Sequence, residues 1–180
     1  MAPHTATRMT YEEFMALPAE EGKHYELVEG ELVVNPAPLP RHQRIVRKIV
    51  GRLDRYFEAH GNGEVWHAPL DVVLSRENVL EPDVAVILSE RASIVAHNNV
   101  QGAPDLVIEV LSEGTRRKDR TVKRRLYEQH GVREIWLVDA DDLSVTIIRN
   151  GEETVVKDIA GSPELPGFVL DLSYVFSDRP

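Results

Sequence analysis

The chain has 180 residues, of which 42% are hydrophobic and 28% are charged, as in an ordinary globular domain. Its 30 acidic and 21 basic residues give a formal net charge of −9, so the surface as a whole is a poor match for a polyanion. The absence of cysteine excludes disulfides, thiolate nucleophiles and cysteine-containing zinc sites. No apolar run approaches the roughly 18 residues of a membrane span, and the first residues lack the apolar core of a signal peptide. We therefore expect a cytoplasmic protein without a membrane partner.

Positive charge is concentrated in two short runs. Residues 41–55 carry a net charge of +5 and residues 116–125 one of +6, and together they hold 13 of the 21 basic residues. One such run is typical of a solvated helix face, whereas two in an acidic chain favour a localised basic surface. The candidates for nucleic-acid contacts on this surface are Arg44, Lys48, Arg117, Arg120 and Arg124.

The first third of the chain predicts a short helix, a hairpin and a long helix. Thr10 and Glu13 have the spacing of a capping box, so we expect a helix over residues 11–17. The runs HYELV and ELVV, separated by Glu29-Gly30, are typical of a β-hairpin. Apolar residues then recur at helical spacing from residue 41 to about residue 59, which predicts a long amphipathic helix.

The remainder of the chain predicts a sheet with one further helix. The last two strands form a C-terminal hairpin around Asn150-Gly151, and a covering segment with one helical turn follows. This order predicts an α/β (α+β) fold with one central mixed sheet flanked by helices. We expect a single domain over residues 1–180, with its core at about 24–160 and a flexible tail at 1–9. The expected strands are residues 64–67, 69–74, 82–88, 104–112, 134–139, 143–149 and 153–159, and the helix is residues 116–130.

Two carboxylates interrupt the apolar pattern of the strands. Glu109 lies within the run DLVIEVL, whose apolar residues indicate a strand covered on both faces. A carboxylate there is costly unless it is paired, hydrogen-bonded or bound to a cation. Asp83 follows Pro82 at the start of another strand, a position that also suits a turn residue. Together they predict a site for a hard divalent cation, and the alternative for Glu109 is an ion pair with an arginine.

The helix at residues 116–130 carries two charged residues on its apolar face. At 100° per residue, Asp119 and Lys123 share the side of Leu126, whereas Lys118 faces away. Lys123 is therefore either an inward-pointing cation or one half of an exposed Asp119–Lys123 pair.

Further polar residues are candidates for supporting a site. His42 lies within the apolar face of the helix at residues 41–59, where a histidine is either a satisfied core residue or part of a site. Glu26 and Glu31 follow the alternation of the first hairpin, which is typical of surface residues, although either could reach a site.

The order of these residues resembles a known superfamily of nucleases. Pro82-Asp83, then Glu109 in an apolar strand, then a helical lysine, resembles the PD-(D/E)XK pattern. Over about residues 10–176, the chain is similar to the Uma-type putative restriction endonuclease family of bacteria. The segments that carry this similarity are HYELVEGELVV, PRHQRIV, EPDVAVI, GAPDLVIEVLS, RKDRTVK and YEQHGVREIWLVD. Asp119 and His42 match polar positions of the family motif.

The resemblance implies a divalent metal, Mg²⁺ or Mn²⁺, held by Asp83, Glu109 and the carbonyl of Val110. Leu111 stands where the superfamily pattern has its lysine. Lys123 matches the helical position to which the lysine of Uma-type members has moved.

The resemblance further implies a restriction-endonuclease-like fold and a metal-dependent endonuclease that hydrolyses phosphodiester bonds, with DNA favoured over RNA. Its catalytic residues would be Asp83, Glu109 and Lys123. The alternative is an inactive nuclease fold that serves as a nucleic-acid- or protein-binding module. The partners to consider are nucleic acid and, in a homodimer, a second copy of the chain. The supporting residues are His42, Asp119 and Glu26.

Overall fold

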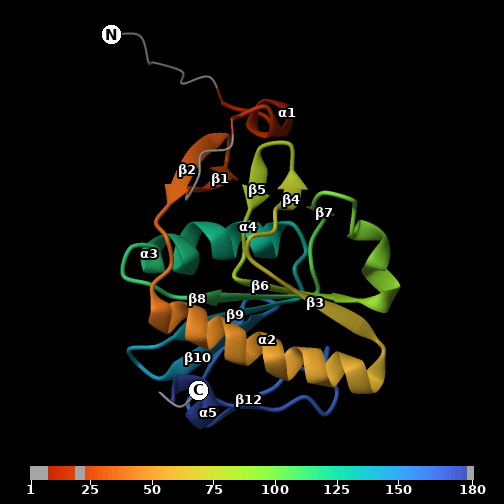
Figure 1. Cartoon of the computed structure of the whole chain (residues 1–180), viewed down its shortest axis with the longest axis vertical. Coiled ribbons are helices and arrows are strands. Elements are labelled where there is room, and N and C mark those ends of the chain that lie inside the picture. The colour runs from red at the N-terminus through yellow and green to blue at the C-terminus, as the bar shows by residue number, and fades with distance from the viewer. Residues whose placement is uncertain (1–7, 19–22, 178–180) are drawn as a thin grey trace.

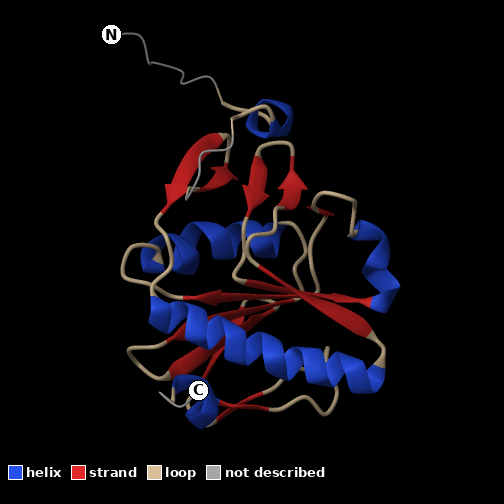
Figure 2. Ribbon diagram, in the orientation of Figure 1, coloured by secondary structure: helices blue, strands red, loops and turns tan. Residues whose placement is uncertain are grey.

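A six-stranded central sheet runs through the middle of the molecule (Figures 1 and 2). The computed structural model describes residues 8–18 and 23–177 of the chain. Neighbouring strands of the sheet are antiparallel except β8 and β9, which are parallel because a helical crossover joins them. The strand order is β11 (Glu152–Val156), β10 (Ser144–Arg149), β9 (Glu134–Asp139), β8 (Leu106–Val110), β6 (Val84–Leu88) and β3 (Gly63–His67).

A second, smaller sheet carries the N-terminal hairpin. The expected central mixed sheet is present, and the hairpin and the strand expected at residues 69–74 belong to this second sheet. Pro69 has no N–H to continue the ladder of β3, so the chain leaves the central sheet after His67. The order of the second sheet is β2 (Glu31–Asn35), β1 (His24–Val28), β5 (Asn78–Leu80), β4 (Val72–Ser75) and β7 (Val100–Gln101).

Both predicted hairpins are present and have similar turns. Glu29 and Gly30 have φ angles of 52° and 80°, and Asn150 and Gly151 have 51° and 78°. Positive φ at both central residues defines the type I′ turn, whose twist matches that of the flanking strands. The strands β1–β2 and β10–β11 are therefore joined as the turn residues predict.

Helices cover both faces of the central sheet (Figure 1). The long helix lies along one face together with the C-terminal segment, and the crossover between β8 and β9 lies on the other. The predicted Thr10–Glu13 capping box starts the first helix, which packs on the small sheet through Phe14. The remaining elements are α1 (Tyr11–Met15), α2 (Pro40–His60), η1 (Ser89–Ile94), α3 (Arg116–Lys118), the π-helical turn η2 (Asp119–Lys123), α4 (Arg124–Gln129), β12 (Ile159–Ala160), β13 (Leu170–Asp171) and α5 (Leu172–Phe176).

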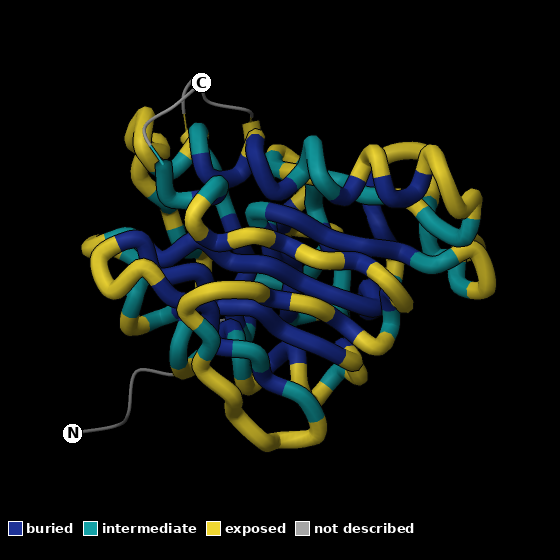
Figure 3. Tube along the Cα trace, turned by 90° about the horizontal axis from the view of Figure 1, so that it is seen from below, coloured by how far each residue is buried: buried dark blue, intermediate teal, exposed yellow. Residues whose placement is uncertain are grey.

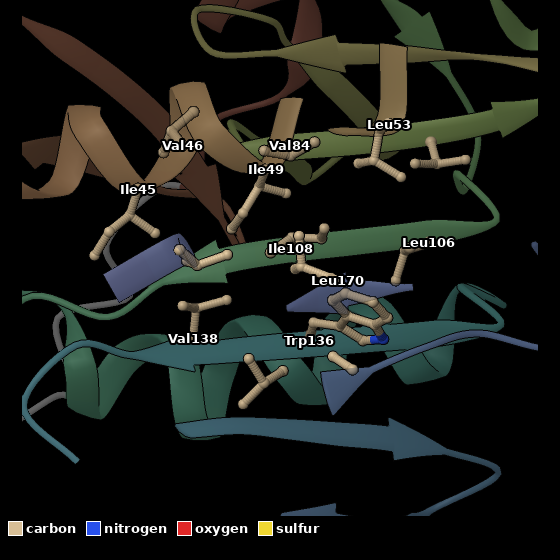
Figure 4. Close-up of a cluster of buried hydrophobic side chains, with 14 of the residues drawn as sticks. Ile45, Val46, Ile49, Leu53, Val84, Leu106, Ile108, Trp136, Val138 and Leu170 are labelled. Carbon is tan, nitrogen blue, oxygen red and sulfur yellow. The ribbon is translucent and has the colours of Figure 1, made fainter. Parts of the chain in front are cut away.

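The main core lies between α2 and the central sheet. Ile45, Ile49 and Leu53 project from α2 toward Ile108 of β8 and Trp136 of β9 (Figure 4). Figure 3 shows the central strands as buried tubes beneath exposed turns. These apolar contacts fix α2 across the strands of the sheet and therefore fix where its N-terminus meets β8.

The alternation of β8 decides which of its side chains meet which helix. Leu106, Ile108 and Val110 belong to the α2 cluster, whereas Val107 and Leu111 belong to the cluster that includes α4. Side chains two apart on a strand share a face. Glu109 is therefore on the α4 side of the sheet, the side on which Lys118 and Lys123 of the crossover lie.

The core extends beyond the expected limits of residues 24–160. Phe14 near the start of the chain and Leu165 and Val175 near its end are buried. Of the expected tail, Met9 is described and its N–H donates to Gly30 O over 2.9 Å, whereas residues 1–7 lie outside the described residues. Among the described residues, no helix is long and apolar enough to cross a bilayer.

Lys48 is buried, which corrects its assignment as a nucleic-acid contact. Lys48 is only 1% exposed. Its Nζ donates to the carbonyl oxygens of Tyr174 and Ser177 and to Ser177 Oγ, over 2.9, 2.7 and 2.9 Å. Lys48 falls between Val46 and Ile49 at the edge of the apolar face of α2, where α5 packs, so its ammonium satisfies acceptors at the C-terminal end of α5.

We predict that Lys48→Ala lowers the free energy of unfolding by about 2 kcal/mol or more, because it leaves buried acceptors without a donor. The matched control is Arg47→Ala, one residue earlier on the exposed side of α2, which should change it by less than about 0.5 kcal/mol. Urea denaturation measures both, and equal effects would contradict the buried placement of Lys48.

Candidate active site

A cavity of about 570 Å³ lies where β8 ends and α2 begins. At this edge the chain passes from β2 into α2 and from β8 into α3 (Figure 1). Every residue that the sequence placed in the catalytic, metal or supporting groups lines it, except Glu26. These lining residues are His42, Asp83, Glu109, Val110, Asp119 and Lys123.

Asp83 is fixed at the junction of β6, β8 and α2. Its Oδ2 accepts a hydrogen bond from Val110 N over 2.7 Å and lies 3.1 Å from His42 Nε2. Burial on its own would lower the pKa of His42, but the hydrogen bond to Asp83 and its charge outweigh burial and raise that pKa. His42 therefore contacts Asp83 at the lining of the cavity, and its Nδ1 is buried without a partner among the described residues.

Glu109 is buried at the floor of the cavity. Its Oε1 accepts from Lys123 Nζ over 2.6 Å and from Tyr127 Oη over 2.6 Å. Burial raises the pKa of Glu109 to about 8, with Asp119 and Asp83 adding to the rise and Lys123 opposing it. The arginine expected as the alternative partner is thus replaced by a lysine. Tyr127 is not among the candidate site residues of the sequence analysis, and its position four residues after Lys123 is the signal that could have placed it here.

Lys123 points inward, as the helical wheel predicts. Besides Glu109, its Nζ contacts Glu26 Oε1 over 2.9 Å and Glu81 O over 3.4 Å, while Asp119 Oδ1 lies 4.0 Å away. Burial on its own would lower the pKa of Lys123, but Glu109 and Glu26 raise it well above its usual value. Lys123 is therefore a buried, permanently charged ammonium and not one half of an exposed pair.

Glu26 is a central residue of the site, although its strand pattern is typical of the surface. It is 0% exposed, and its carboxylate accepts from Asn35 Nδ2 over 2.9 Å and Glu81 N over 3.0 Å as well as from lysine. Burial on its own would raise the pKa of Glu26, but Lys123 and Lys118 lower it to about 2. The alternation of polar and apolar residues in β1 wrongly predicts that Glu26 is exposed. In the fold, β1 lies between β2 and β5, and the crossover covers its polar face.

Lys118 also reaches into the cavity, which corrects its outward placement on a regular helical wheel. Its Nζ lies 2.6 Å from Glu26 Oε2 and 2.7 Å from Asn35 Oδ1. The cause is η2, in which Arg124 N donates to a carbonyl five residues earlier, so this turn is wider than an α-helical one. Lys118 and Lys123 are five residues apart and would point about 140° away from each other on a regular α-helix. The wider turn brings the two side chains closer to the same direction, and both reach Glu26.

Much of the second basic run is paired with carboxylates. Arg120 lies 3.2 Å from Asp139, and Arg124 pairs with Glu128 and Glu153. Arg117 is exposed and has no ion pair among the described residues. The basic surface that the charge count suggests is therefore smaller in the folded protein.

The oxygen atoms on the cavity floor suit a hard divalent cation. The described residues contain no group of three His, Cys, Asp or Glu side chains arranged to hold a metal ion. A cation would instead be held by the carboxylates of Asp83 and Glu109 and the carbonyl of Val110, with water completing the shell, as Mg²⁺ accepts. Four carboxylates of the site, Glu26 and Asp119 included, face two lysines, and this excess of negative charge contributes to the raised pKa of Glu109. These are the groups of the site that could hold such a cation.

We predict that Glu26 gives the protein an acid-sensitive stability. Because its pKa is about 2 when folded and about 4.5 when unfolded, the stabilisation is complete above pH 4.5 and is lost as the pH falls toward 2, about 3 kcal/mol in all. Urea denaturation from pH 5 to 2.5 should show this slope in the wild type and a shallower one in Glu26→Gln. Glu31→Gln, an exposed carboxylate of β2, should keep the slope, and its loss there would contradict the assignment.

A solved structure shares the fold. The crystal structure of a protein described as a putative nuclease belonging to DUF820, from Anabaena variabilis ATCC 29413, superposes with a TM-score of 0.81. The match covers 93% of this chain and 97% of that one at 22% sequence identity, so the likeness shows a common fold.

The family comparison covers most of the chain. No curated protein matches it. The family model described as "Uma2: Putative restriction endonuclease" matches residues 11–173. This range contains every residue of the cavity described above and all strands of both sheets. The chain therefore belongs to the Uma2 family of putative restriction endonucleases.

Proposed function

We propose that this protein is a metal-dependent endonuclease that hydrolyses phosphodiester bonds in DNA. The observation that carries the proposal is the buried Glu109 carboxylate, held by Lys123 and Tyr127 in the same cavity as Asp83, which accepts a hydrogen bond from Val110 N. A buried carboxylate is costly unless its charge is compensated, and Lys123 is shared between Glu109 and Glu26, so a bound cation would complete the compensation. Membership of a nuclease family supports the reaction class.

The side chains of the site would divide the work of hydrolysis. Bound Mg²⁺ or Mn²⁺ supplies Lewis-acid polarisation of the phosphate and lowers the pKa of a water ligand. Val110 N and His42 orient Asp83, and Lys123 and Tyr127 orient Glu109. Because its pKa is raised, Lys123 stays protonated and acts by its charge rather than as a general base.

A basic path beside the cavity supports a nucleic-acid substrate. A second hollow of about 680 Å³ runs along α2 and is lined by Arg44 and Arg47. Gln43 lines both hollows, so they adjoin. Together with the exposed Arg117 of α3, these cations would hold backbone phosphates without reading the base sequence.

The test of the proposed reaction is cleavage. Purified protein incubated with plasmid DNA and Mg²⁺ or Mn²⁺ should nick or linearise it, and Glu109→Gln should reduce the rate at least ~100-fold, about the loss of one essential electrostatic group. Parallel reactions with a single-stranded RNA decide the nucleic acid. Binding without cleavage of either substrate would refute the endonuclease and favour an inactive nuclease fold.

We predict that Asp83→Asn and Glu109→Gln each abolish Mn²⁺ binding in calorimetry, because each removes a carboxylate ligand. Without metal, Glu109→Gln should be as stable as the wild type or more stable, since burial and neighbouring carboxylates already disfavour the charged form of Glu109. Glu31→Gln is the control for a lost carboxylate at the surface. Wild-type Mn²⁺ affinity in either site variant would rule out these ligands.

We also predict that DNA binding weakens as a power of the salt concentration, with similar slopes for unrelated sequences. Arg117→Ala should reduce the slope by about 0.9, the value for one phosphate contact, and Arg120 or Arg124 should contribute less because each must first leave its carboxylate partner. Lys157→Ala, an exposed lysine beyond β11, is the control. An unchanged slope for Arg117→Ala would show that this arginine is an ordinary solvent-exposed residue that does not contact DNA.

A further inference from the structure

Lys123 has no donor to spare for a substrate. Its side chain is 4% exposed. Its ammonium carries three N–H groups, and it contacts three acceptors: Glu109 Oε1 at 2.6 Å, Glu26 Oε1 at 2.9 Å and Glu81 O at 3.4 Å. Contact with a phosphate would require one of these interactions to break, and two of them are with buried carboxylates.

Lys118 differs from Lys123 in both exposure and bonding. Its side chain is 21% exposed and lines the same cavity. In the part of the chain that the structure describes, its acceptors are Glu26 Oε2 and Asn35 Oδ1. One N–H of its ammonium is therefore left for a ligand in the cavity.

The charge around the cavity is unfavourable for a phosphate unless a cationic side chain contacts that phosphate. Its lining holds six carboxylates, and three Lys or Arg residues: Arg41, Lys118 and Lys123. Arg41 lies at the rim and is bound to Asp141 and to the Ala140 carbonyl. A phosphodiester entering this acid-rich cavity gains most from a cation that has an unused donor, and Lys118 meets that description.

We propose that Lys118 contacts a phosphate of the substrate, whereas Lys123 is a positioning residue that holds Glu109 and Glu26. The inference rests on the proposed nuclease function and assigns its phosphate-binding lysine. Glu26 can release Lys118 to a phosphate because it keeps the ion pair with Lys123 and the hydrogen bonds from Asn35 Nδ2 and Glu81 N.

The experiment compares three glutamine variants, Lys118→Gln, Lys123→Gln and Lys157→Gln. Glutamine removes the charge but can still donate a hydrogen bond to Glu26, so the fold is more easily kept than with alanine, and urea denaturation verifies it. The first measurement is the salt dependence of binding to a fluorescein-labelled duplex in EDTA, by anisotropy. We expect Lys118→Gln to reduce the slope of log K against log salt by about 0.9, and the other two variants to keep it.

The second measurement separates contact from positioning. Calorimetry with Mn²⁺ should show wild-type affinity for Lys118→Gln and a 10- to 100-fold loss for Lys123→Gln, as expected when a group that orients a ligand is removed. In cleavage assays, Lys118→Gln should raise KM about 10-fold, the loss of one charge-assisted hydrogen bond, and Lys118→Arg should restore most of it. Lys123→Gln should lower kcat.

Each outcome decides between the assignments. A reduced salt slope for Lys123→Gln with an unchanged slope for Lys118→Gln would reverse the two roles, and unchanged slopes for both would show that neither lysine meets a phosphate. If the wild type binds DNA but cuts no nucleic acid, the nuclease proposal fails while the salt slopes still decide the contact of Lys118. If the wild type shows no salt-dependent binding, the inference is overturned.

Discussion

The site depends on one buried carboxylate, that of Glu26, which joins two lysines of the crossover to the small sheet. Its two oxygens lie 2.9 Å from Lys123 Nζ and 2.6 Å from Lys118 Nζ. Burying a carboxylate is costly, and the two ammonium groups beside it, one buried and one partly exposed, repay that cost only when the geometry is good and the remaining acceptors are filled. Asn35 and Glu81 N fill them. The resulting contact sets the distance between the small sheet and the crossover on the central sheet.

The ion pair between Lys123 and Glu26 also affects the charge of Glu109, the proposed catalytic carboxylate. Lys123 is shared between Glu26 and Glu109, so it neutralises only part of the charge on Glu109, and the pKa of Glu109 remains raised to about 8 by burial and by the other carboxylates. A fully compensated Glu109 would have little affinity for a further cation. Partial compensation keeps the carboxylate ordered through Lys123 and Tyr127, and it would still leave negative charge for the divalent metal that we propose.

The charge of the folded protein is arranged differently from the charge of the sequence. The two basic runs suggest a large cationic surface, but folding places Lys48 beneath α5 and pairs Arg120 and Arg124 with carboxylates. What remains near the cavity is a narrow set of cations along α2 and at the start of the crossover. Such a set could bind the phosphates of the proposed substrate locally while the molecule as a whole stays acidic. Contacts with phosphates alone do not distinguish one base sequence from another.

Sequence and tertiary structure contribute different parts of this description. The sequence by itself determined the two hairpins through their turn residues, α2 through its apolar periodicity, and the group of Asp83, Glu109 and an inward Lys123. These features depend on local geometry or on the cost of a charge in an apolar strand, both of which are readable along the chain. Only the tertiary structure decided that the N-terminal hairpin belongs to a sheet separate from the central one and that Glu26 is buried, because strand neighbours are set by contacts far apart in sequence. It alone also decided that Lys118 turns inward, since one π-helical turn changes the phase that a regular helical wheel assumes.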